Sequence, residues 1–156
     1  MEFVERYVYA DKVSATVYGN HIKINLNGTS GRVPYALIEV VSIVISDDVD
    51  HQGIVLSMEE DVPNFNSTRN KGTVLALVGL DALQGANYHY SLVGQGTKAL
   101  TYGSLENVVL TITNTAGGSI VVNSLDSISI LFKCSYPRPD EIQDTFRTQI
   151  PLPSRV

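Results

Sequence analysis

The side chains with the clearest capacity for chemistry lie in one short acidic segment. Asp47, Asp48, Asp50 and His51 fall close together, and residues 59–61 add three further carboxylates. Carboxylate oxygens grouped in this way can bind Ca²⁺. The spacing fits no EF-hand loop, which needs a glycine at its sixth position. The charge pattern therefore favours a solvent-exposed acidic turn, with a cation site as the alternative, and we assign no metal ligands.

The histidines and the cysteine form no recognisable catalytic arrangement. A catalytic triad needs a histidine beside a nucleophile, and no serine stands in a G-x-S-x-G motif. His21, His51 and His89 include no His-x-His pair, which a cupin-like metal enzyme would need. The single cysteine, Cys134, allows neither an intrachain disulfide nor a cysteine zinc site, and its alternating surroundings predict a buried apolar side chain. We expect no enzyme activity, no catalytic residues and no cofactor.

A glycine motif at residues 94–99 deserves a separate interpretation. Its order, Gly-Gln-Gly-Thr-Lys-Ala, matches the relaxed dinucleotide fingerprint G-x-G-x-x-A. That chemistry requires a helix whose N-terminus binds the pyrophosphate. Here Gly103 and the β-like flanking residues oppose a helix, so the motif predicts a loop.

Composition narrows the class of protein. The chain has 156 residues, which suits one domain, and 44% of them are apolar. Only 17% are charged and the net charge is −5, so we expect no nucleic-acid binding. No apolar run reaches the length of a membrane span, and residues 1–6 lack the basic-then-apolar order of a signal peptide. These features predict manufacture in the cytoplasm.

The elements that must position these residues are β-strands. Short segments rich in Val, Ile, Thr and Tyr alternate apolar with polar residues and are separated by Gly, Asn and Asp. Spacings near 8–12 residues are typical of an antiparallel sandwich or barrel. Residues 3–9 form either an edge strand or an arm, and residues 59–71 form a surface loop. The predicted strands are 13–18, 21–26, 35–45, 53–58, 73–80, 88–93, 98–102, 106–113, 120–122 and 126–134.

The pattern changes after Cys134. Residues 135–156 contain four prolines and little alternation, which predicts an extended Pro-rich C-terminal arm with at most one helical turn, capped by Asp140. We expect a β domain at residues 1–134 and an arm at residues 135–156 that packs on a neighbouring subunit. The predicted interface residues are Tyr136, Pro137, Arg138, Pro139, Phe146, Pro151 and Pro153.

The order of elements in the last third of the chain is that of a known family. Residues 105–132 comprise an alternating strand, a glycine turn, a short apolar strand, a corner rich in Asn and Asp, and a last alternating strand. Residues 35–43 and 54–77 supply earlier strands of the same kind. This pattern resembles the single-jelly-roll capsid proteins, of the penton or minor capsid type, of large icosahedral double-stranded DNA viruses and their virophage and transposon relatives. The resemblance implies an all-β fold with a single antiparallel jelly-roll sandwich.

The resemblance also implies a function. It suggests a structural protein of the virion, either the penton subunit at the five-fold vertices or a minor capsid subunit. Its partners would be copies of itself, in a homopentamer, and neighbouring capsid proteins. The alternative is a jelly-roll lectin-like or receptor-binding module, with residues 88–90 and the acidic residues 47–50 at one end of the sandwich. A cupin-like enzyme ranks last.

Overall fold

The chain folds almost entirely into β-strands. The computed structural model describes residues 3–25, 35–58, 73–94, 96, 98–102 and 107–138. The only helical element in this part of the chain is a 3₁₀ turn, η1 (Val122–Ser124), and no helix there could span a membrane. The strands are β1 (Phe3–Asp11), β2 (Thr16–Tyr18), β3 (His21–Asn25), β4 (Tyr35–Asp47), β5 (Ile54–Met58), β6 (Thr73–Gln84), β7 (Asn87–Leu92), β8 (Lys98–Tyr102), β9 (Asn107–Asn114) and β10 (Ser127–Pro137).

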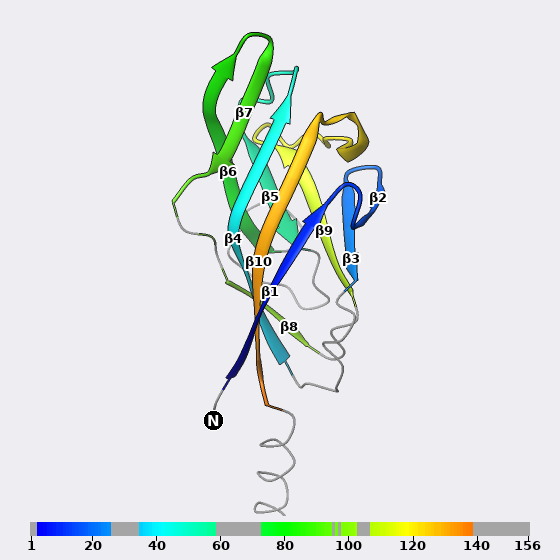
Figure 1. Cartoon of the computed structure of the whole chain (residues 1–156), viewed down its shortest axis with the longest axis vertical. Helices are drawn as coiled ribbons and strands as arrows, with labels where there is room; N and C mark the ends of the chain where they lie inside the picture. The colour runs from blue at the N-terminus through cyan, green and yellow to red at the C-terminus, as the bar shows by residue number, and fades with distance from the viewer. Residues whose placement is uncertain are drawn as a thin grey trace, which may run out of the picture.

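All strand pairs are antiparallel and belong to one curled sheet. Its order is β1-β10-β4-β7-β6-β5-β9-β3-β2, and β8 also pairs with β4. The sheet curls so that β1, β10 and β4 lie in front of β5 and β9, with β2 and β3 at the right (Figure 1). One set of pairs is nested along the chain: β1 with β10, β3 with β9, β4 with both β7 and β8, and β5 with β6. The pairs β10–β4, β5–β9 and β6–β7 join this set side by side into the sheet. The expected all-β antiparallel architecture is confirmed.

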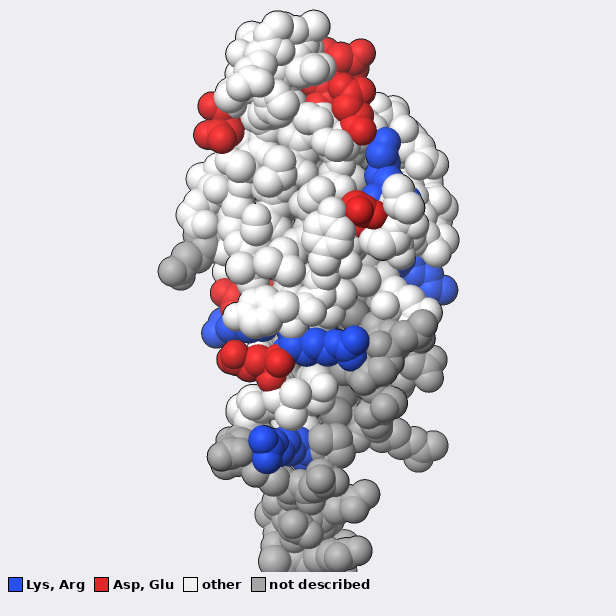
Figure 2. All heavy atoms as spheres, in the orientation of Figure 1, with Lys and Arg blue, Asp and Glu red and all other residues white. Residues whose placement is uncertain are grey.

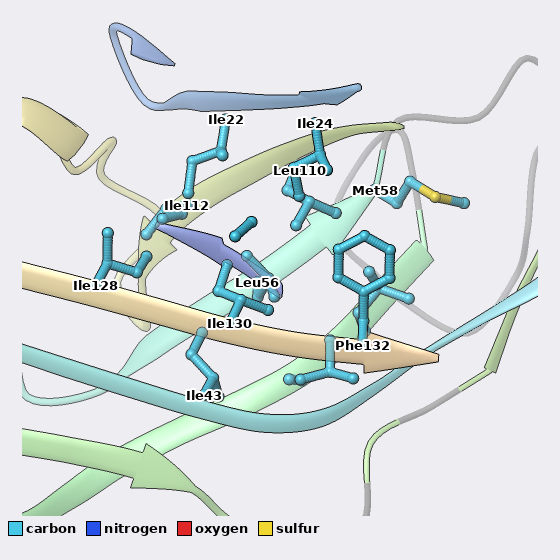
Figure 3. Close-up of a cluster of buried hydrophobic side chains, with 14 of the residues drawn as sticks. Ile22, Ile24, Ile43, Leu56, Met58, Leu110, Ile112, Ile128, Ile130 and Phe132 are labelled. Carbon is cyan, nitrogen blue, oxygen red and sulfur yellow. The ribbon is translucent and has the colours of Figure 1, made fainter. Parts of the chain in front are cut away.

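The hydrophobic core lies between the two curled halves of the sheet. On β10 the side chains at positions 128, 130, 132 and 134 are buried, as the alternation of the sequence predicts. Ile128, Ile130 and Phe132 point toward side chains of β3, β5 and β9 (Figure 3). Because these strands come from both ends and the middle of the sequence, the core can form only when the whole sheet has assembled.

Strand β4 pairs with different strands along its two halves, and a glycine lies where the partner changes. Residues 44–47 of β4 pair with β7, whereas residues 35–39 pair with β8. Between them Gly96 approaches the backbone so closely that a Cβ atom there would lie 2.8 Å from the Val40 carbonyl oxygen and 3.2 Å from that of Leu75. The chain enters strand β8 at Lys98, so no helix follows the glycines. Gly94 and Gly96 thus lie between β7 and β8, and packing requires a glycine at position 96.

Two short segments differ from the sequence prediction. The expected strand 120–122 leads instead into η1, because the Val122 N–H donates to the Gly19 carbonyl oxygen across 2.9 Å. The expected strand 13–18 is shortened to β2 because Asp11 accepts hydrogen bonds from the Val13 and Ser14 N–H groups, at 2.9 and 2.8 Å, and so bends the chain. The bond from the Ser14 N–H also lowers the pKa of the Asp11 carboxyl group.

The two ends of the described chain meet in one strand pair. Residues 3–9, for which an edge strand and an arm were the alternatives, lie in the edge strand β1. Strand β10 runs through Pro137, three residues beyond the expected end of the β domain at Cys134. The predicted loop 59–71 and the predicted helical turn after Asp140 lie outside the described residues.

The buried thiol of Cys134 gives a first prediction. Burial raises its pKa from 9.0 to about 12, partly opposed by the charge of Arg6. We expect no reaction of the native thiol with a chromogenic disulfide reagent at pH 8, and immediate reaction after unfolding in urea. Because the raised pKa favours the protonated folded state, its stabilising effect is complete below pH 9 and decreases between pH 9 and 12. The loss is at most about 1.4 kcal/mol per pH unit. Equally fast labelling of folded and unfolded protein would contradict this burial.

Candidate functional site

The acidic turn between β4 and β5 contains a buried carboxylate. Ile43, Ile45 and Asp47 lie at alternate positions of β4, and all three side chains face the core. Asp47 is only 2% exposed and is the one buried charged side chain among the described residues. The interpretation of the whole segment as a solvent-exposed turn is therefore wrong for Asp47.

Asp47 has two hydrogen-bond partners in its own turn. One carboxylate oxygen lies 2.6 Å from Nε2 of His51, four residues later. The other accepts the N–H of Asp48 at 2.9 Å. A buried carboxylate needs such partners, since desolvation without them costs several kcal/mol. Both oxygens are thus engaged in holding the turn.

Tyr90, on the neighbouring strand β7, holds the same turn. Its hydroxyl group accepts the N–H of His51 at 2.8 Å and donates to the carbonyl oxygen of Val49 at 3.1 Å. The side chain is fully buried, and this burial raises the pKa of its hydroxyl group. Tyr90 is therefore a neutral hydrogen-bonding anchor that connects the turn to the sheet.

Three carboxylates come together beside this anchor. Oxygen atoms of Asp47, Asp48 and Asp126 all lie within 4.8 Å of one another. Ca²⁺ takes six to eight oxygen ligands, so these residues could supply part of a coordination shell. Asp50, which belonged to the predicted acidic group, instead accepts the N–H of Gln52 at 2.9 Å. A cation would compete with His51 for Asp47, and the bonding just described suits a structural anchor better.

The three histidines lie on different parts of the sheet. His21, on β3, lies with Nδ1 3.2 Å from the Thr111 hydroxyl group, and His51 pairs with Asp47. His89 lies on β7, paired in register with Ser46 of β4. Of residues 88–90, only Tyr90 is fully buried. The structure therefore brings one histidine to the acidic turn and leaves the other two elsewhere.

Only part of the predicted interface falls in the described chain. Tyr136 and Pro137 lie in β10, in register with Val4 and Phe3 of β1. Tyr136 packs against the core, Pro137 is buried and Arg138 follows the strand. Residues 135–137 thus belong to the sheet of their own chain, which differs from the expected packing on a neighbour. The remaining predicted interface residues, Pro139, Phe146, Pro151 and Pro153, lie outside the described residues.

Part of the outer face of the sheet, on β10, β4 and β7, carries no Asp, Glu, Lys or Arg side chain. Figure 2 shows a broad uncharged area between an acidic group at one end and a charged band. In the charged band Lys133 lies 3.7 Å from both Glu5 and Glu39. The residues of this uncharged face are Ser42, Val44, Ser46, His89, Ser91, Ser127, Ser129 and Leu131.

No protein family model matches the sequence, and no curated protein matches it significantly. Function must therefore be inferred from the residues and geometry described above.

Proposed function

We propose that this protein is a structural, non-enzymatic subunit of a viral capsid and that its curled sheet is a jelly roll. In the virion it occupies the five-fold vertices as a homopentamer, beside other capsid proteins. The nested strand pairing carries the jelly-roll part of the proposal, and the uncharged outer face of the sheet carries the capsid part.

A jelly roll is an antiparallel hairpin wound around itself. Its first strand therefore pairs with its last strand, its second with its second-to-last, and so on inward. The pairs β1–β10, β3–β9, β4 with β7 and β8, and β5–β6 follow this order. Jelly rolls occur in viral capsid proteins, lectins and cupins. The order of pairing thus supports all three classes, and the surface must distinguish among them.

The uncharged face supports the capsid class. Subunits that close a ring by head-to-tail contacts need large surfaces with few charges to desolvate. Val44 lies near the middle of this face and is 49% exposed. A cupin-like enzyme has less support, since His21 and His51 lie beside Thr111 and Asp47, and His89 pairs in register with Ser46 on the uncharged face.

Assembly of the purified full chain tests the proposal. We expect five-membered rings by electron microscopy at high protein concentration. Val44→Asp should prevent assembly without unfolding the subunit, because it places a charge on the uncharged face. The matched control is Val121→Asp, which changes a side chain of similar exposure, 52%, away from this face and should assemble normally.

Other outcomes would contradict the proposal at different levels. Closed rings with a number of subunits other than five would remove the vertex position and leave the capsid role. Failure to assemble, together with calcium-dependent binding on a glycan array, would favour a lectin-like module that uses Asp47, Asp48 and Asp126. Failure of both would exclude the capsid role.

A further inference from the structure

Strand β1 is an open edge of the sheet. It pairs with β10 on one side and has no other strand partner in the described part of the chain. Its nine residues span about 30 Å at the rise of an antiparallel strand. Along it, Tyr7 and Tyr9 are 59% and 56% exposed. A row of backbone donors and acceptors therefore faces outward beside exposed aromatic rings.

This edge lacks several of the features that usually prevent strand addition. Proteins protect exposed edges with prolines, bulges, very short strands or charged side chains, most often lysine. Strand β1 does carry the charged residues Glu5, Arg6 and Asp11, and these restrict the register in which it can pair. Strand β1 contains no proline and no lysine, and its register with β10 is continuous from Phe3 to Asp11. By contrast, β2 at the other end of the sheet is only three residues long. The sheet thus offers one edge suited to pairing.

We propose that strand β1 pairs antiparallel with strand β1 of a second copy of this chain, which joins the two sheets into one. Two identical antiparallel strands are related by a two-fold axis. Every allowed register therefore places one residue of β1 opposite the same residue of the second copy. Exposed residues must also meet exposed residues, because a slip of one position would reverse the faces. These conditions leave few registers.

The charges of β1 select among those registers. Placing Tyr7 opposite Tyr7 pairs all nine residues and sets Glu5 opposite Tyr9 and Arg6 opposite Val8. A slip of two positions in one direction sets Arg6 opposite Arg6, and in the other direction Glu5 opposite Asp11. Like charges directly opposite each other destabilise a strand pair, whereas paired aromatic rings stabilise it. The register with Tyr7 on the two-fold axis is therefore favoured.

Cysteine crosslinking tests both the contact and its register. Tyr7→Cys should give a covalent dimer with a thiol crosslinker a few ångströms long, since opposite Cβ atoms lie about 5 Å apart. Glu5→Cys alone should not, because its counterpart would lie about 14 Å away along the pair. A mixture of Glu5→Cys and Tyr9→Cys chains should crosslink. The native Cys134 is buried and does not interfere.

Two further measurements complete the test. Tyr18→Cys, at an exposed position on β2, reports random collision and should crosslink slowly. Tyr7→Glu should weaken the dimer at least about tenfold in sedimentation equilibrium and leave the subunit folded, since Lys133 is its register partner on β10. Crosslinking of Tyr7→Cys no faster than Tyr18→Cys, efficient crosslinking of Glu5→Cys alone, or a chain that stays monomeric at all concentrations would overturn the inference. The readout is a dimer in solution, so it does not depend on the capsid role.

Discussion

Replacing Phe132 with alanine is expected to lower the free energy of unfolding by about 3 to 5 kcal/mol. The ring is fully buried in the core, on a strand that pairs with β1 on one side and β4 on the other (Figure 3). Removing it loses the transfer free energy of the ring and leaves a cavity that these strands cannot close. Urea unfolding followed by circular dichroism would measure the change.

The neighbouring residue supplies the control for this substitution. Leu131 lies on the same strand but faces the outer side of the sheet, in register with Ser42 and Tyr9. Leu131→Ala should cost less than about 1 kcal/mol, because this partly exposed side chain is not in the core. Equal losses in the free energy of unfolding for the two variants would mean that Phe132 does not face the core while Leu131 faces outward.

Asp47→Ala is expected to destabilise the protein by about 2 to 3 kcal/mol. The substitution leaves the His51 ring and the Asp48 N–H without the carboxylate that they contact at 2.6 and 2.9 Å. The turn held by Tyr90 should then open more often. Hydrogen exchange of the His51 amide, which donates to the Tyr90 hydroxyl group, should accelerate together with the loss of stability.

Asp48→Ala is the matched control, since Asp48 contributes an exposed carboxylate to the same group of three. Its removal relieves repulsion from Asp47 and Asp126, so we expect a change within about 0.5 kcal/mol. If both alanine variants unfold at the same urea concentration, Asp47 does not anchor the turn.

The strands with regular alternation were predictable from sequence. In β9 and β10 the apolar residues recur at every second position, and the same positions are buried. Residues 120–122 have no such period, and their path is decided by the Val122 N–H, which binds a carbonyl group far away in the sequence. The local sequence pattern predicts a strand where alternating side chains define one buried and one exposed face. It fails where a hydrogen bond to a distant part of the chain determines the backbone conformation.

The candidate site was only partly predictable. The alternation of Ile43 and Ile45 continues to Asp47, so a buried carboxylate was readable in the sequence, but the run of aspartates suggested a solvated turn. Nothing in the sequence connects Asp126 with this turn, because the antiparallel pairing of β10 with β4 brings them together. Such proximity depends on sheet register, which sequence alone leaves open.

The pairing of β1 with β10 has a consequence for synthesis of the chain. Among the described strands the ribosome makes β1 first, and the only strand partner of β1 there, β10, is made after all the others. The β1–β10 pair can therefore form only after all the other described strands have been made, and contacts between such distant segments form slowly. Until β10 is made, β1 has no strand partner within its own described chain. Strands β1 of neighbouring nascent chains on one polysome could then pair with each other.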